Sequence, residues 1–198
     1  MASRPKRLVL FASGSGTNVQ KICEYFEHDN RIETILVAGN NAHAGVWDRI
    51  KPFKIPNYCF DKSALNNGEV LHHLEKHQPD LIVLAGFLLK IPEAIVATFP
   101  QQIINIHPAL LPKYGGKGMY GLNVHRAVKK NKDTVSGISI HYVNPNYDEG
   151  QLIFQATVNL SEQDTPESIA YKVHQLEHKH FSKVIEQLLF NTKNSDEK

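Results

Sequence analysis

The sequence has few cysteines, no long apolar run and no excess of charge of one sign. Cys23 and Cys59 are the two cysteines among 198 residues, and each lies in an apolar stretch, so we expect buried, reduced thiols rather than a disulfide framework. No window approaches the roughly 18 to 20 continuous apolar residues of a membrane span, and no signal-like segment opens the chain. These absences predict a cytoplasmic protein that does not act in a membrane.

The charges of the chain nearly balance. Lysine and arginine number 22, aspartate and glutamate number 20, and the formal net charge is +2. A chain without a strong basic field is not expected to bind nucleic acid. We therefore expect small-molecule partners, with anionic substrates allowed, and a monomer or weak homodimer.

Length and composition predict one domain. A hydrophobic content of 41% in 198 residues closes a sizeable core without help from metal or disulfides. We expect a single domain over residues 1–198, with a core at 7–190 and a polar tail at 191–198.

Apolar strands and amphipathic helices alternate through the first half of the chain. Short apolar runs predict buried strands at 8–12, 35–38, 81–85 and 103–107. Helical spacing predicts helices at 17–26, 44–50, 70–77 and 122–130. Alternation of this kind is typical of an α/β fold with an open, twisted, mostly parallel sheet and helices on both faces, similar to a Rossmann fold.

The last third of the chain has a different pattern. Residues 134–143 and 152–159 alternate as half-exposed antiparallel strands do, so we expect antiparallel strands in the C-terminal part of the sheet. Thr165 is a good N-cap and Pro166 suits the first position of a final helix.

A glycine turn follows the first strand and opens a helix. The backbone N–H groups of Gly16, Thr17 and Asn18 can receive an anion there, helped by the helix dipole. A dinucleotide site would place a third glycine where Val19 stands, so a single phosphate group is favoured. The alternative is a turn that serves the chain reversal alone.

Asn105 and His107 end an otherwise apolar strand. Residues two apart on a strand share a face, so the two side chains project together. An amide donor beside an imidazolium can hold the oxyanion of an acyl-transfer step. A structural pair bonded to the backbone remains the alternative.

A carboxylate would orient this histidine and raise its pKa. The loop from residue 144 to 150 offers Asp148 and Glu149, and the residues alone leave both open.

The histidines predict no metal site. His73 and His77 share a helix face, as do His174 and His178, but neither pair forms a His-Glu-x-x-His motif or has an evident third ligand.

Several motifs together resemble the folate-dependent formyltransferases. They run in order from about Leu8 to Phe190 and comprise Ser13-Gly14-Ser15-Gly16-Thr17-Asn18, Leu84-Ala85-Gly86-Phe87, Asn105-Ile106-His107-Pro108-Ala109-Leu110-Leu111-Pro112, His141-Tyr142-Val143 and Asp148-Glu149-Gly150. The resemblance implies that 10-formyltetrahydrofolate, as a co-substrate without a metal, donates its formyl group. The amino-terminal turn narrows the acceptor to the amine of glycinamide ribonucleotide.

The resemblance also assigns the catalytic roles. Asn105 and His107 would stabilise the oxyanion, with His107 as proton donor to the leaving folate nitrogen. Asp148, rather than Glu149, would keep the histidine protonated and help to shuttle the proton from the amine.

The binding residues follow from the same resemblance. Gly16, Thr17 and Asn18 would bind the ribonucleotide phosphate and Glu177 the ribose, and His174, one turn before Glu177, is expected to reach the phosphate. Asn105 and the loop that begins at Asn144 would contact the folate. The pterin ring would bind the backbone groups of Leu88, Leu89, Lys90 and Ile91.

Two segments depart from the family pattern. The loop at 113–121 is longer than usual, and the region at 61–68 is shortened, without the arginine that some members use to contact folate. Lys62 and Lys117 are the candidates for a substitute charge.

Three other functions compete with this one. A formyltetrahydrofolate hydrolase shares the Asn-His-Asp centre, but the seven residues before Leu8 leave no room for its regulatory domain. Formyltransferases for sugar amines or methionyl-tRNA usually append a carboxyl-terminal domain. A phosphosugar-binding module would need the glycine turn but not the polar pair.

Overall fold

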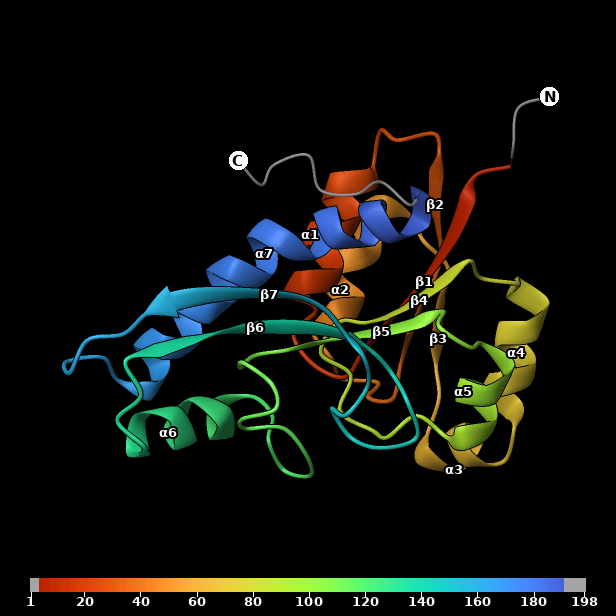
Figure 1. The fold of residues 1–198 in the computed structure, drawn as a ribbon. Coiled ribbons are helices and arrows are strands. Elements are labelled where there is room, and N and C mark those ends of the chain that lie inside the picture. The colour runs from red at the N-terminus through yellow and green to blue at the C-terminus, as the bar shows by residue number, and fades with distance from the viewer. Residues whose placement is uncertain (1–3, 191–198) are drawn as a thin grey trace.

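The computed structural model describes residues 4–190, which form a seven-stranded sheet with helices on both faces (Figure 1). The strands are β1 (Lys6–Ala12), β2 (Ile32–Gly39), β3 (Asn57–Cys59), β4 (Leu81–Leu84), β5 (Ile103–His107), β6 (Val135–Tyr142) and β7 (Leu152–Asn159). Their order is β3-β2-β1-β4-β5-β6-β7, parallel from β3 to β5 and antiparallel at the β5–β6 and β6–β7 pairs. The predicted fold class is confirmed.

The helices are α1 (Thr17–Phe26), α2 (Val46–Ile50), α3 (Lys62–Asn66), α4 (Glu69–His77), α5 (Glu93–Thr98), α6 (Leu122–Lys130) and α7 (Pro166–Phe190), with a 3-10 turn at Lys51–Phe53. The sequence patterns did not predict β3, α3 or α5, because elements of three to six residues are too short to show a period. The predicted N-cap of α7 is present: the Ser168 N–H donates to Thr165 Oγ1 over 3.2 Å.

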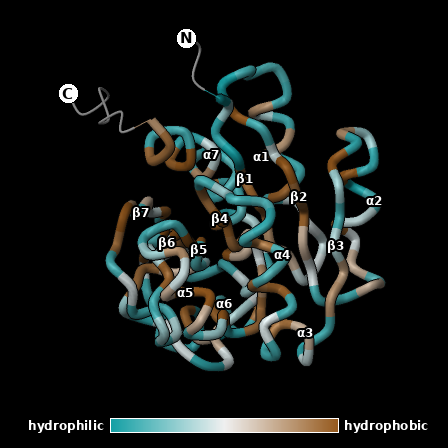
Figure 2. The backbone as a smooth tube through the Cα atoms, turned by 90° about the vertical axis from the view of Figure 1, so that its right-hand side faces the viewer, coloured by the Kyte–Doolittle hydropathy of each residue, from teal (hydrophilic) through white to brown (hydrophobic). Residues whose placement is uncertain are grey.

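Alternate residues of β1 enter two separate cores. Leu8 and Leu10 pack in the core under α1, α6 and α7, whereas Val9 and Phe11 pack in the core under α3, α4 and α5. In Figure 2 much of the central strands is brown, the colour of hydrophobic residues, as expected for strands with both faces covered. No helix among residues 4–190 is long and apolar enough to cross a membrane.

The strand order reverses between β1 and β4, and the loops that follow these two strands are bonded to each other. The Ser13 N–H donates to the Gly86 carbonyl over 3.0 Å, and the Leu88 N–H donates to Ser13 Oγ over 2.9 Å. The carboxyl ends of parallel strands at such a reversal form the crevice in which ligands bind. Ser13 therefore fixes one wall of that crevice.

The two cysteines differ in their surroundings. Cys23 is buried in α1, and burial raises the pKa of its thiol to about 12. The prediction that Cys59 is buried was wrong: it is exposed, because β3 is a short strand at the edge of the sheet. The predicted tail at 191–198 lies outside the described residues.

Close packing of β6 against β7 generates the first prediction. A Cβ on Gly137 would collide with the carbonyl oxygen of Ala156 on β7. We expect Gly137→Ala to lower the free energy of unfolding by about 1–3 kcal/mol, the usual scale of overpacking, measured by urea denaturation. Gly14→Ala is the control, since nothing lies within 4 Å of a Cβ there. Equal losses in both variants would contradict this reading of the β6–β7 contact.

Candidate active site

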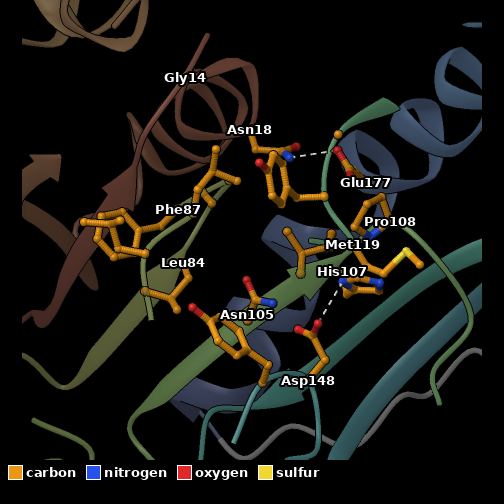
Figure 3. A pocket seen from close by; sticks show the side chains of 18 of the residues that line it. Gly14, Asn18, Leu84, Phe87, Asn105, His107, Pro108, Met119, Asp148 and Glu177 are labelled. Atoms are coloured by element: carbon orange, nitrogen blue, oxygen red, sulfur yellow. Dashed lines mark hydrogen bonds and ion pairs between the residues drawn. The ribbon is translucent and has the colours of Figure 1, made fainter. Parts of the chain in front are cut away.

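A cavity of about 570 Å³ opens at the carboxyl ends of the central strands (Figure 3). Its walls come from the loops after β1, β4 and β5, the loop before β7, and one face of α7. The structure brings all of the predicted site residues to this cavity: Gly16, Thr17, Asn18, Leu88, Leu89, Lys90, Ile91, Asn105, His107, Asn144, Asp148, His174 and Glu177.

Asn105 lies opposite His141 of β6 and bonds to it. The His141 Nδ1–H donates to the Tyr142 carbonyl over 2.9 Å, and its Nε2 lies 3.1 Å from the amide nitrogen of Asn105. An amide carries two N–H groups, so one of them stays available to the cavity. His141 thus orients Asn105.

His107 is 3% exposed and makes contacts through both ring nitrogens. Nε2 donates to the Tyr114 carbonyl over 2.8 Å, since a carbonyl can only accept. Nδ1 lies 3.6 Å from Oδ2 of Asp148, and Figure 3 shows the two side chains facing each other. Because the Nε2 proton is bonded to the backbone, Nδ1 is the nitrogen left for proton transfer.

Asp148 is held in place by the backbone as well as by histidines. Its Oδ2 accepts the Gly116 N–H over 2.9 Å, and its Oδ1 lies 3.6 Å from Nε2 of His141. Its φ of 55° is left-handed, which is uncommon for a residue other than glycine and is often found at functional sites. Glu149 is exposed and accepts from Asn146, so Asp148 is the carboxylate that faces His107.

The pKa values of His107 and Asp148 both lie below their ordinary range. Burial lowers the pKa of His107, and although the Asp148 charge and the Tyr114 carbonyl raise it, burial outweighs them. Burial raises the pKa of Asp148. The His141 side chain, the charge of His107 and the Gly116 N–H lower it, and their joint effect is larger than that of burial. The carboxylate therefore acts on the histidine in the expected direction, yet the buried ring is neutral at pH 7.

The glycine turn has the geometry of an anion site. Gly16 precedes α1 with a φ of 77°, and a Cβ there would lie 2.5 Å from the Cβ of Val46, so the turn requires glycine. The first N–H groups of α1 have no carbonyl one turn earlier to bond. They open into the cavity at Thr17 and Asn18.

A hydrogen-bond network joins this turn to α7. Glu177 Oε2 accepts from the Asn18 amide and from His174 Nδ1, each over 2.8 Å. His174 Nε2 lies 3.0 Å from Thr17 Oγ1. The network places an imidazole beside the start of α1, with the Glu177 carboxylate one turn further along α7.

The loop after β4 lines the opposite wall. Leu88 is 49% exposed at the cavity mouth, whereas Ile91 is 4% exposed and anchors the loop in the core. Across from them, Asn144 accepts the Asn146 N–H over 3.0 Å, which stabilises the turn that leads to Asp148.

The long loop at 113–121 is part of the site rather than a surface insertion. It supplies the Tyr114 carbonyl to His107 and the Gly116 N–H to Asp148. It also places Lys117 in the cavity wall, while Lys62 begins α3 and is not among the lining residues.

Sequence reasoning gave no role to three residues at this site, Ser13, His125 and His141. His125 lines the cavity at 4% exposure, and His141 is 2% exposed. His125 could have been found from the sequence, because it is a histidine on the apolar face of the helix that follows the loop at 113–121. Among the described residues, no three His, Cys, Asp or Glu side chains are grouped to hold a metal ion.

An open, mostly parallel sheet with a glycine turn before a helix and an Asn-His-Asp cluster at one cavity is typical of an enzyme that transfers an acyl-type group. The family model for formyl transferases matches residues 6–185. The chain belongs to this family and is a formyl-transferring enzyme.

Similar proteins include phosphoribosylglycinamide formyltransferases. The chloroplastic one of Arabidopsis thaliana is 38% identical over 190 residues, which cover 92% of this chain and 65% of that relative. The one of Bacillus subtilis is 34% identical, with 93% and 95% covered. This chain thus spans somewhat less than two thirds of the plant relative and nearly all of the bacterial one.

Solved structures agree in fold. The phosphoribosylglycinamide formyltransferase of Anaplasma phagocytophilum is 30% identical, with a TM-score of 0.86 over 97% of this chain and 91% of that one. The enzyme of Coxiella burnetii is 34% identical, with a TM-score of 0.85 over 96% and 91%.

The contact between His107 and Asp148 generates the second prediction. Because the Asp148 charge raises the pKa of His107, Asp148→Asn should lower that pKa further, as measured by NMR titration of the imidazole. Glu149→Gln, which neutralises the adjacent exposed carboxylate, should leave it unchanged. A His107 pKa that is equal in wild type and Asp148→Asn would show that the carboxylate does not act on the ring.

Proposed function

We propose that the protein transfers the formyl group of 10-formyltetrahydrofolate to the amine of glycinamide ribonucleotide. The products are formylglycinamide ribonucleotide and tetrahydrofolate, a step of de novo purine (IMP) synthesis. The observation that carries the proposal is one cavity with an anion-binding helix start at one end and the Asn105, His107 and Asp148 cluster at the other.

The cluster suits attack of an amine on a formyl carbon. The new C–N bond forms as the formyl oxygen gains negative charge, and the free Asn105 N–H donates to that oxygen on the cavity wall, with the His107 ring beside it. A negative charge beside His107 favours its protonated form, and so opposes the effect of burial. His107 therefore becomes a stronger base as the oxyanion develops.

Proton movement completes the reaction. The attacking amine loses a proton through Asp148, which reaches Nδ1 of His107 across 3.6 Å. His107 then gives a proton to the folate nitrogen as the old C–N bond breaks. The proton lost by the amine is thus balanced by the one gained by tetrahydrofolate, and no metal is needed.

The ribonucleotide would lie between α1 and α7. Its phosphate binds the N–H groups at Gly16, Thr17 and Asn18, with His174 adjacent. The ribose hydroxyls bond to Glu177, whose Oε1 has no hydrogen bond among the described residues.

The folate would occupy the other half of the cavity. Its pterin ring bonds to the backbone at 88–91 and lies near Asn105 and the turn at Asn144. The acidic tail of folate binds Lys117, since this lysine is in the wall of the cavity and Lys62 is not. The cytoplasmic setting, the small-molecule partners without nucleic acid or membrane, and the monomer or weak homodimer belong to the same proposal.

Release of tetrahydrofolate with and without glycinamide ribonucleotide tests the reaction, and this is the third prediction. We expect release only with the ribonucleotide present. Release in its absence would indicate a hydrolase, and no release under either condition would indicate a binding module. In the same assay His107→Ala and Asp148→Asn should each lower kcat at least about a hundredfold, the scale of lost acid–base or oxyanion function. Glu149→Gln should retain normal turnover.

The position of His174 generates the fourth prediction. If its ring contacts the phosphate, His174→Ala should raise KM for glycinamide ribonucleotide about tenfold or more, the scale of a lost charge-assisted hydrogen bond, with KM for the folate unchanged. His72→Ala, on an exposed helix face, is the matched control. An unchanged KM for the ribonucleotide would remove His174 from the site.

A further inference from the structure

His125 is a buried histidine in the wall of the cavity. It has no role in the proposed reaction. It lies on α6, one turn after the helix begins at Leu122, and α6 packs against α7. The side chain is 4% exposed, and it lines the same cavity as His107 and Glu177.

The hydrogen bonding of the ring indicates which nitrogen carries its proton. Nδ1 is buried and has no hydrogen-bond partner among the described residues. Nε2 is not among the buried nitrogens without a partner. Burial lowers the pKa of His125, so the ring is neutral at pH 7 and carries one N–H. Since orphaned buried N–H groups are rare, the proton belongs on Nε2. The ring then offers the cavity a hydrogen-bond donor without a charge.

His125 interacts with charged groups at both ends of the site. The negative charge of Glu177 raises its pKa and the charge of His107 lowers it, so both groups are within electrostatic reach of the ring. In the proposed function, Glu177 binds the ribose and His107 acts where the amine reacts.

The acceptor has one group between these two points. Glycinamide ribonucleotide runs from phosphate to ribose, then through an amide and a methylene to the amine. The amide carbonyl oxygen is the hydrogen-bond acceptor between ribose and amine. We infer that the Nε2–H of His125 donates to this oxygen, and that His125 thereby selects acceptors that carry an amide at this position; the inference rests on the proposed function.

The test compares two acceptors in two proteins. One acceptor is glycinamide ribonucleotide and the other is its C-riboside analogue with a trans-alkene in place of the amide, which is planar and uncharged but has no carbonyl. We expect wild type to prefer the amide by about tenfold to a hundredfold in kcat/KM, because the alkene leaves a buried donor unpaired. In His125→Phe, which keeps a ring but cannot donate, this preference should shrink at least about fivefold.

Three further variants separate selection from folding. His125→Gln, whose amide can donate, should retain the preference for the amide acceptor. His125→Leu replaces the Phe variant if that protein does not fold. His178→Leu is the matched control, since His178 also has a buried nitrogen without a partner among the described residues but does not line the cavity. It should show the wild-type preference.

The outcomes separate the two proposals. If wild type does not formylate glycinamide ribonucleotide at all, the proposed function fails. If wild type turns it over and the variants that cannot donate keep the full preference for the amide, the role of His125 alone is overturned. KM for the folate should be unchanged in every variant, because the carbonyl belongs to the other substrate.

Discussion

The carboxylate of Asp148 is the group on which the rest of the site depends. Its Oδ2 accepts the Gly116 N–H over 2.9 Å, and the rings of His107 and His141 lie 3.6 Å from its two oxygens, so the carboxylate meets three different parts of the chain. A buried carboxylate is stable only with such partners, and their joint effect keeps its pKa below the usual value. The left-handed φ of 55° at Asp148 is tolerated because these contacts over-determine its position.

The sheet sets the distance between the two halves of the site. The glycine turn follows β1, and Asn105 and His107 end β5, which lies one strand further along the sheet, beyond β4. These parallel strands end at the same edge, so the turn and the polar cluster face one crevice, and Ser13 ties the loop after β1 to the loop after β4. The α7 helix then closes the side of the cavity next to the glycine turn through Glu177 and His174.

Local patterns in the sequence predicted much of this arrangement. The helix at 17–26 and the strand at 103–107 have the observed bounds, because their apolar periods and their glycine or proline boundaries are complete within the segment. The short elements β3, α3 and α5 and the exposure of Cys59 depend on packing between distant segments. The contact of Tyr114 with His107 could not be predicted either. It uses a backbone carbonyl, which every residue type carries, so the sequence contains no signal for it. The choice of Asp148 over Glu149 came from family resemblance, and the structure supplies its physical basis in the direction of each side chain.

The long loop at 113–121 changes how His107 should be understood. Its Tyr114 carbonyl binds one ring nitrogen and, like the Asp148 charge, raises the pKa of His107, but burial of the ring outweighs both and lowers that pKa. The ring is therefore neutral at pH 7, and in the proposed reaction it takes up a proton when the oxyanion forms. In the proposed reaction this order places the strongest stabilisation at the tetrahedral state rather than at the bound substrate, which is the condition for an interaction to raise kcat. The loop that departs most from the family pattern thus contributes directly to the electrostatics of the reacting group.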